Sequence, residues 1–297
     1  MIIIIILISI IFVAVSAFSI GLMRFITLPK YRTPCSESKS IETRDNLWGN
    51  FDLYEKITFN MQMDDGYLLH GLLIPGSCSG KFVIITHGYT YNKFGGAKYV
   101  NVFHELGYNA VIYDIRHHGD NKDFFCSMGH YESKDICNIA RILREKYGQD
   151  ISIGLHGESL GAASSLLALG SETNFSFCVA DCPFTDLGIL LEDLGWNIMH
   201  IPKPLSHLAS FASFIIHGYR LDHIKPIDSF KTNTSTPVCF IHGADDKFIP
   251  PAHSSNAYNS CKQYKELHLI LHAGHAESYK FARDEYHNIV STFLENC

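Results

Sequence analysis

The sequence has little excess charge and no long block of basic residues. Its 24 basic and 30 acidic side chains give a formal net charge of −6, and the isoelectric point is near 6.3. A protein that holds nucleic acid by its phosphates needs a concentrated positive surface. The composition therefore gives no indication of nucleic-acid binding. No repeat of fixed period is present, which argues against a solenoid or propeller.

The nine cysteines form no CxxC pair and have no spacing typical of a disulfide framework. Several lie inside apolar strand patterns, as Cys178 and Cys239 do, where a thiol packs as a small hydrophobic group. The histidines at 117, 118 and 130 also lack a zinc-type spacing. We therefore expect reduced cysteines, as in a cytoplasmic compartment, and no metal or cofactor.

The N-terminal segment is the least ordinary part of the composition. Residues Ile2 to Met23 carry no charge, and 22 residues at about 1.5 Å each span roughly the 30 Å hydrocarbon core of a bilayer. Basic residues follow the segment, beginning with Arg24, whereas the basic n-region of a cleaved signal peptide is missing. A cleavage-like sequence, Val15-Ser16-Ala17, keeps the signal-peptide alternative open.

We predict that residues 1–26 form a single-pass membrane anchor. The positive residues on its C-terminal side favour a cytoplasmic location for the domain that follows, with an extracytoplasmic location as the alternative. Residues 27–50 are polar and contain Pro29 and Pro34, which is typical of a linker. Residues 51–297 are then expected to form the catalytic domain.

Strand and helix patterns alternate through residues 51–297. Two alternating runs, 57–61 and 67–74, flank the turn signal Asp64-Asp65-Gly66 and predict an antiparallel hairpin. Continuous apolar strands separated by amphipathic helices follow, which predicts a mostly parallel sheet with helices on both faces. Expected strands are 82–86, 110–114, 151–155, 177–181, 238–241 and 267–271; expected helices are 97–106, 131–147, a helix from 159, 252–264 and 278–294.

Residues 184–236 are too long for a simple connection between two strands. They are rich in aromatic residues and histidine, with Pro202 and Pro204 near the middle. We expect a helical cap inserted over the carboxyl ends of the strands, where open α/β sheets bind ligands. Additional core packing away from any site is the alternative.

The pentapeptide Gly157-Glu-Ser-Leu-Gly161 fits the G-x-S-x-G pattern. It follows a β-branched strand and precedes a run of small residues, the context in which a strand-to-helix turn exposes a serine hydroxyl. The glycines allow the neighbouring chain to approach closely. Because glycine and serine are common, a simple helix N-cap is the competing interpretation of Ser159.

A nucleophilic serine needs a base and a carboxylate that orients the base. In this type of fold the chain order is serine, then acid, then histidine. Asp245 and Asp246 follow the strand pattern at 238–241, and His275 follows the strand pattern at 267–271. The order and the positions at strand ends are both suitable.

The sequence resembles serine hydrolases of the α/β-hydrolase superfamily from about Phe51 to the C-terminus. It is most similar to membrane-anchored bacterial hydrolases grouped with serine aminopeptidase-like and cinnamoyl-esterase-like enzymes. The resemblance depends on THGYT at 86–90, YDIRHHG at 113–119, GESLG at 157–161, IHGADDKFIP at 241–250 and HAGH at 272–275. His117 departs from the usual Asp-x-Arg-Gly-His-Gly pattern, in which a glycine stands at that position.

The resemblance implies a role for each matching residue. Ser159 is the nucleophile, His275 the general base and Asp246 the carboxylate, with Asp245 as its competitor. The backbone N–H groups of Leu160 and Tyr89 are implied as the oxyanion hole. His87 in the THGYT motif is expected to be structural.

We therefore expect a membrane-tethered serine esterase that forms an acyl-enzyme. A peptidase or a thioesterase is the alternative within the same chemistry, and Glu192 and Asp193 could hold the α-amine of an aminopeptidase substrate. A non-catalytic binding protein with a hydrolase fold is a less favoured alternative, because all three triad residues are present.

Overall fold

The computed structural model describes residues 1–121, 124–171, 173–233 and 235–297. The chain divides into two compact units, which we call the helical unit and the sheet unit. The helical unit contains Met1–Lys30 and Asp186–Lys225, and the sheet unit contains Tyr31–Thr185 and Pro226–Cys297.

The sheet unit is built on an eight-stranded sheet in the order β1-β2-β4-β3-β5-β6-β7-β8. β1 and β2 pair in antiparallel fashion, β2 is antiparallel to β4, and the other pairs are parallel. The mostly parallel α/β sheet predicted from the sequence is therefore confirmed. The strands are β1 Ile57–Gln62, β2 Leu68–Ile74, β3 Lys81–Thr86, β4 Asn109–Tyr113, β5 Ser152–Glu158, β6 Cys178–Asp181, β7 Val238–Gly243 and β8 Lys265–Ile270.

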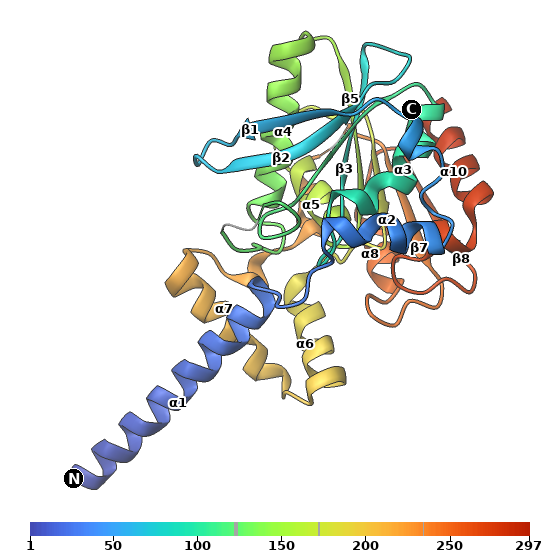
Figure 1. Ribbon diagram of the computed structural model, residues 1–297. Coiled ribbons are helices and arrows are strands. Elements are labelled where there is room, and N and C mark those ends of the chain that lie inside the picture. The colour runs from blue at the N-terminus through green and yellow to red at the C-terminus, as the bar shows by residue number, and fades with distance from the viewer. Residues whose placement is uncertain (122–123, 172, 234) are drawn as a thin grey trace. The chain divides into compact units, whose positions relative to one another are not determined.

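Helices cover both faces of the sheet (Figure 1). They are α3 Ala97–Glu105, α4 Glu132–Tyr147, α5 Leu160–Leu169, α8 Ala252–Ser260, α9 Ser278–Phe281 and α10 Arg283–Glu295. One core joins Phe103 of α3 and Phe293 of α10 to strand residues such as Ile112 and Val179. On the other face, α4 packs against α5. α4 and α10 have the apolar stripe expected of amphipathic crossovers, with Ile136, Ile139 and Leu143 of α4 and Ile289, Val290 and Phe293 of α10 buried.

The register aligns the carboxyl ends of the central strands. Thr86 of β3 is opposite Gly157 of β5, and Glu158 is opposite Asp181 of β6. Asp181 is in turn opposite Ile241 of β7. The loops that follow these strands therefore begin at one edge of the sheet, where their side chains can meet.

Residues 31–50 are folded, which corrects their interpretation as a linker. They contain the helix α2 (Cys35–Arg44), and the Trp48 side chain is buried beside the ring of Phe51. The Thr33 N–H donates to the Thr90 carbonyl at 2.8 Å, and the Asn92 side-chain amide donates to the Thr33 carbonyl at 2.9 Å. Hydrophobic periodicity does not reveal this segment because much of its docking uses hydrogen bonds.

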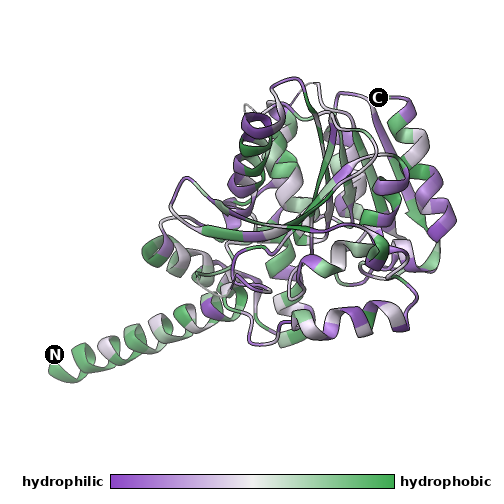
Figure 2. Cartoon of the chain, turned by 45° about the horizontal axis from the view of Figure 1, so that its top comes forward, coloured by the Kyte–Doolittle hydropathy of each residue, from purple (hydrophilic) through white to green (hydrophobic). Residues whose placement is uncertain are grey.

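The helical unit contains α1 (Ile2–Thr27), α6 (Leu187–Met199) and α7 (Lys203–His217). α1 is long and apolar enough to cross a membrane, with a mean hydropathy of 3.1 in its most apolar window; Figure 2 shows this apolar character along most of its length. The predicted insertion at 184–236 is longer than the helical part, because Pro226–Lys231 forms a 3-10 turn of the sheet unit. Thr234 lies outside the described residues. A position of α6 and α7 over the strand ends stays a prediction.

Candidate active site

Ser159 lies in a sharp turn between β5 and α5. Its φ angle is +55°. Residues other than glycine rarely adopt this left-handed backbone conformation, which is costly for serine. The Ser159 N–H donates to the Asp181 carbonyl at 2.8 Å, which joins the turn to the neighbouring strand. The turn therefore presents a serine side chain at the carboxyl end of the sheet.

The two glycines of the pentapeptide are required by close backbone contacts. A Cβ atom at Gly161 would lie 2.0 Å from the Thr86 carbonyl oxygen, and one at Gly157 would lie 2.3 Å from the carbonyl carbon of Gly161. Both distances are far shorter than van der Waals contact. Any side chain here would push α5 away from the sheet and displace Ser159.

A chain of hydrogen bonds begins at Ser159. Its Oγ lies 2.9 Å from Nε2 of His275, and Nδ1 of His275 lies 2.7 Å from Oδ2 of Asp246. His275 is in the loop that follows β8, and Asp246 is in the loop that follows β7. The structure thus brings together the serine, the histidine and the carboxylate that the sequence singled out, and such a chain allows the imidazole to accept the serine proton.

Asp246 is held in place from several sides. Its side chain is fully buried, and its Oδ1 accepts hydrogen bonds from the N–H groups of Phe248 and Ile249, both at 2.9 Å. Burial by itself would raise the pKa of this carboxyl. Hydrogen bonds from His242, His275 and the Ile249 N–H outweigh burial and hold the pKa well below its usual range. Asp246 is therefore a carboxylate at neutral pH.

Asp245 occupies a different environment from its neighbour. Its side chain is 64% exposed and lies 3.9 Å from Nδ1 of His272. This geometry favours Asp246 over Asp245 as the partner of His275.

His242 is a support for Asp246 that the sequence reasoning did not assign. It is fully buried, and its Nε2 lies 2.8 Å from the Ile249 carbonyl and 3.2 Å from Oδ2 of Asp246. Its Nδ1 lies 2.7 Å from the Ser254 hydroxyl. The signal in the sequence was the position of His242 at the end of β7, four residues before Asp246.

The loop that follows β3 lies beside the nucleophile. A Cβ atom at Gly88 would be 3.5 Å from Cβ of Ser159, which puts the backbone next to Tyr89 close to the serine. Leu160 is the first residue of α5, where backbone N–H groups have no partner within the helix and the helix dipole is positive. Both residues expected to form the oxyanion hole thus lie near Ser159 along the chain or in space.

Two buried histidines join this loop to the loop that follows β4. His87 Nε2 accepts the Ile115 N–H at 3.0 Å, and its Nδ1 donates to the Gly88 carbonyl at 2.7 Å. In the opposite direction, His118 Nε2 accepts the Thr90 N–H at 2.9 Å. Burial lowers the pKa of His87 to about 4 and that of His118 to about 3. Both imidazoles are neutral at pH 7, which leaves one ring nitrogen of each free to accept a backbone N–H.

Behind Ser159 lies a buried polar network that sequence patterns did not indicate. Lys98 Nζ lies 2.6 Å from Oε2 of Glu158. The Tyr99 hydroxyl donates to Glu158 at 2.6 Å and to Asp181 at 3.2 Å, and the Ser278 hydroxyl donates to Asp181 at 3.0 Å. Burial and the nearby Glu158 raise the pKa of Asp181 to about 6. The network fixes the strand ends from which the Ser159 turn is built.

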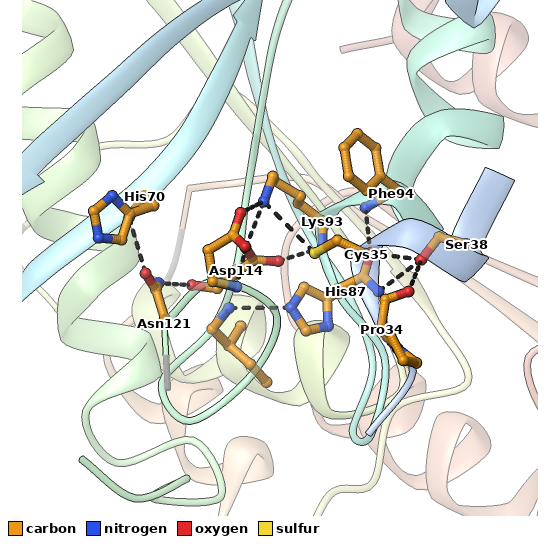
Figure 3. Close-up of polar contacts among 12 residues, drawn as sticks. Pro34, Cys35, Ser38, His70, His87, Lys93, Phe94, Asp114 and Asn121 are labelled. Atoms are coloured by element: carbon orange, nitrogen blue, oxygen red, sulfur yellow. Dashed lines mark hydrogen bonds and ion pairs between the residues drawn. The ribbon is translucent and has the colours of Figure 1, made fainter. Parts of the chain in front are cut away.

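Another cluster of polar groups already contains a cation. Cys35, Asp114 and Asp120 have donor atoms close enough for a metal ion. The Lys93 ammonium lies among them, 2.6 Å from each carboxylate and 3.9 Å from the thiol (Figure 3). Because this ammonium supplies the positive charge, the cluster acts as a structural ion-pair network. Figure 3 also shows Asn121, in the loop that follows β4, where its side-chain oxygen accepts the backbone N–H of His70 in β2.

Comparisons with known proteins show the family of the chain. Residues 97–297 match the model of the prolyl oligopeptidase family. Uncharacterized protein YqkD of Bacillus subtilis is 32% identical over 257 residues, covering 84% of this chain and 83% of YqkD. An uncharacterized membrane protein of Saccharomyces cerevisiae is 22% identical, covering 66% of this chain and 64% of its own.

Solved structures share the fold. An esterase of Pyrococcus furiosus, Pf2001, superposes with a TM-score of 0.69 at 23% identity, over 84% of this chain and 94% of the esterase. An acylaminoacyl peptidase of Pyrococcus horikoshii gives a TM-score of 0.63 at 18% identity. That match covers 82% of this chain and 41% of the peptidase.

Proposed function

Because the chain belongs to the prolyl oligopeptidase family, within the α/β-hydrolase superfamily of serine hydrolases, we propose that it cleaves carboxylic esters through Ser159, His275 and Asp246. The observation that carries this proposal is the hydrogen-bonded chain from the Ser159 hydroxyl through His275 to a buried carboxylate. The φ angle of +55° at Ser159 supports it, because strained conformations of this kind cluster at functional sites.

The proposed reaction proceeds through an acyl-enzyme. His275 Nε2 takes the Ser159 proton while Oγ attacks the ester carbonyl. The backbone N–H groups of Leu160 and Tyr89 stabilise the oxyanion of the tetrahedral intermediate. His275 then protonates the leaving alcohol as the carbon–oxygen bond breaks. Water, deprotonated by His275, attacks the acyl group and releases Ser159.

Asp246 acts through His275. Its carboxylate keeps the Nδ1 proton in place, so that Nε2 faces Ser159 as the acceptor, and it stabilises the imidazolium that forms during each step. His87 and His118 are positioning residues, because they join the loop that contains Tyr89 to the loop that follows β4.

A peptidase is the second candidate, favoured by the family to which residues 97–297 match. An aminopeptidase would need free carboxylates to hold a substrate α-amine. Asp193 lies 2.9 Å from Lys203, and Glu192 lies 3.2 Å from His207. Because both carboxylates already have basic neighbours within the helical unit, we place ester hydrolysis first. A thioesterase would use the same residues.

An activity-based fluorophosphonate probe tests the nucleophile. We expect the full-length protein in detergent to be labelled and Ser159→Ala to show no labelling. Ser171→Ala, at an exposed serine, is the matched control and should label like the wild type. Labelling of Ser159→Ala at the wild-type rate would contradict the assignment.

The substrate class is tested with matched acyl esters, acyl thioesters, acyl amides and aminoacyl amides. We expect kcat/KM to be highest for the esters, with little turnover of the amides. Turnover of acyl or aminoacyl amides at rates comparable with those of the esters would favour the peptidase instead.

We also propose that α1 anchors the protein with the sheet unit in the cytoplasm, supported by the basic residues that follow the apolar segment. Protease added to intact cells should leave the protein whole, and protease added after lysis should degrade it. Degradation in intact cells would place the sheet unit on the outer side.

A further inference from the structure

The helix α7 has an unusual distribution of side chains. Its buried positions are occupied by small residues, and its exposed positions by large apolar ones. The buried residues are Ser206, Ala209, Ser210, Ala212 and Ser213, and the exposed ones include Phe211, Phe214, Ile215 and Ile216, which are between 49% and 66% exposed. In a water-soluble helix the large apolar face turns inward.

Helical geometry separates most members of the two groups. At about 100° per residue, Ser206, Ser210 and Ser213 fall on one side of α7, and Phe211 and Ile215 fall on the other. Phe214 lies next to Phe211, whereas Ile216 falls between the buried Ala209 and Ala212. We call Phe211, Phe214 and Ile215 the outward face of α7.

Two of the three serines on the inward face of α7, Ser206 and Ser210, are paired within the helical unit, whereas the buried Ser213 hydroxyl has no hydrogen-bond partner among the described residues. The Ser210 hydroxyl donates to Oδ1 of Asp222 at 2.5 Å, and the Arg220 guanidinium donates to both carboxylate oxygens of Asp222 at 2.9 and 2.6 Å. The Ser206 hydroxyl donates to the Lys203 carbonyl at 2.7 Å. A small, hydrogen-bonded interior with bulky apolar side chains outside is how helices pack when their surroundings are lipid.

α7 contacts α1 near the C-terminal end of the apolar segment. The buried side of α1 is formed by Ser19, Met23 and Thr27, and α1 packs against α7. His217, at the end of α7, has its Nε2 3.2 Å from the sulfur of Met23. Met23 directly precedes Arg24, the first charged residue of the chain.

This contact lies at the level of a membrane boundary. An apolar helix needs about 20 residues to cross the hydrocarbon core, and Ile2 to Met23 supplies that length. A helix that contacts α1 at Met23 is therefore at the depth where the acyl chains meet the headgroups. Apolar side chains with a polar opposite face are stabilised at this depth.

We propose that the outward face of α7 lies in the interfacial layer of the same lipid bilayer that α1 crosses. The helical unit then binds the membrane twice, once by a spanning helix and once by a helix lying at the surface. This inference concerns the membrane and does not depend on the proposed ester hydrolysis.

Tryptophan quenching by brominated phospholipids in vesicles tests the proposal in the full-length protein. The chain has two tryptophans, so Trp196→Phe leaves only Trp48, which is 8% exposed. In that background we would add Phe214→Trp. The matched control is Phe281→Trp, because Phe281 belongs to the sheet unit and is 52% exposed, as Phe214 is. Phe12→Trp in α1 is the positive control.

We expect brominated lipid to remove most of the added fluorescence of Phe214→Trp and Phe12→Trp, and to leave that of Phe281→Trp unchanged. Unquenched Phe214→Trp beside quenched Phe12→Trp would overturn the proposal. A blue-shifted but unquenched signal would also overturn it and would indicate that protein covers this face, from this chain or a second copy. Lack of quenching of Phe12→Trp would show that α1 does not insert and would overturn the proposal at its premise.

Two further measurements guard against a local folding defect. Ile215→Trp, on the same face, should give the same quenching as Phe214→Trp. The far-UV circular dichroism spectrum and the midpoint of urea unfolding should be the same in every variant. Agreement of the two α7 variants, with an unchanged spectrum and midpoint, is the expected result; disagreement between them would contradict an extended lipid-facing surface.

Discussion

The sheet unit and the helical unit each contain a carboxylate whose pKa is held far below its usual range, and the two carboxylates serve different ends. Asp246 in the sheet unit has His275 as a partner, and His275 lies in turn within hydrogen-bond distance of Ser159, the proposed nucleophile. Asp222 in the helical unit is bound by Arg220, Ser210 and His207. For both carboxyls, burial by itself would raise the pKa. The hydrogen bonds lower the pKa by more than burial raises it, so the net shift is downward.

The two units differ in which side chains they bury. The sheet unit buries its large apolar side chains, and its buried side-chain hydrogen bonds hold the loops around Ser159. The helical unit turns small and polar groups inward and large apolar groups outward. A hydrogen-bonded carboxylate thus orients His275 in the mechanism we propose for the sheet unit, and it stabilises a polar interior in the helical unit.

The largest expected effect separates the two carboxylates. Asp246→Asn should lower kcat by about 10⁴-fold, because the amide cannot hold the His275 tautomer or stabilise its charged form. Asp222→Asn should leave the rate of fluorophosphonate labelling unchanged. Steady-state hydrolysis and labelling kinetics measure both. Asp245→Asn is the adjacent control and should resemble the wild type; if it lost more activity than Asp246→Asn, the assignment of the acid would be wrong.

A smaller effect distinguishes glycines in the two units. Gly161→Ala should destabilise the sheet unit by about 3 kcal/mol or more, because the new Cβ would lie 2.0 Å from the Thr86 carbonyl oxygen. Gly195→Ala, inside α6, has its closest neighbour at 3.8 Å and should stabilise that helix by about 0.5–1 kcal/mol. Urea unfolding followed by Trp48 and Trp196, one in each unit, measures the two changes.

If Gly161→Ala and Gly195→Ala destabilised the protein equally, the close backbone contact at Gly161 would not explain the loss of stability. Gly80→Ala, with no heavy atom within 4 Å of its new Cβ, is a further control in the sheet unit. Gly80→Ala should leave the urea midpoint of the unfolding transition followed by Trp48 fluorescence unchanged.

Next in size is a pH-dependent effect at His118. His118→Gln should destabilise the sheet unit by about 1–3 kcal/mol at pH 7–8, because it disturbs the acceptor of the partly buried Thr90 N–H. The folded pKa of about 3 is below the unfolded value of about 6.5. The unfolded state therefore binds the extra proton as the pH falls below 6.5, and the wild type loses stability.

The free energy of unfolding of the wild type should consequently approach that of His118→Gln as the pH falls. The difference between the two should decrease by up to about 1.4 kcal/mol per pH unit, from pH 6.5 down to about pH 4. Urea midpoints at four or five pH values measure it. A gap that widened with acidification would show that His118 is charged in the folded protein.

The smallest effect concerns His117, which stands where the Asp-x-Arg-Gly-His-Gly pattern has a glycine. Its φ angle is +65°, which is costly for a side chain other than glycine. His117→Gly should be neutral or should stabilise the sheet unit by up to about 1 kcal/mol, because relief of this cost is partly offset by the flexibility of glycine when unfolded. Thermal unfolding measures the change. A clear loss of stability would mean that the His117 side chain contributes more than its backbone conformation costs.

Much of the sheet unit could be predicted from the sequence because its elements have clear periods. The amphipathic stripe of α4 and the continuous apolar strands fall close to their expected positions. The serine, acid and histidine could be singled out because each follows a strand, and parallel strands bring such positions to one edge.

Features that depend on hydrogen bonds between distant segments could not be predicted. Nothing in the pattern of residues 31–50 indicates that Thr33 binds the Thr90 backbone. The pairing of His118 with Thr90, and of Lys98 with Glu158, likewise involves residues far apart in sequence with no period to reveal them. The outward face of α7 was visible only as an apolar, aromatic-rich stretch, because composition does not tell which side of a helix is buried.

The hydrogen bond from Thr33 to Thr90 has a practical consequence for anyone who wishes to work with a shortened, more soluble chain. Residues 31–50 look expendable next to the apolar segment, yet they hold the backbone one residue after Tyr89. A chain truncated at residue 50 would keep Ser159, His275 and Asp246 and still lose part of the scaffold around the loop beside them. A truncation that begins at Tyr31 removes α1 and retains that scaffold.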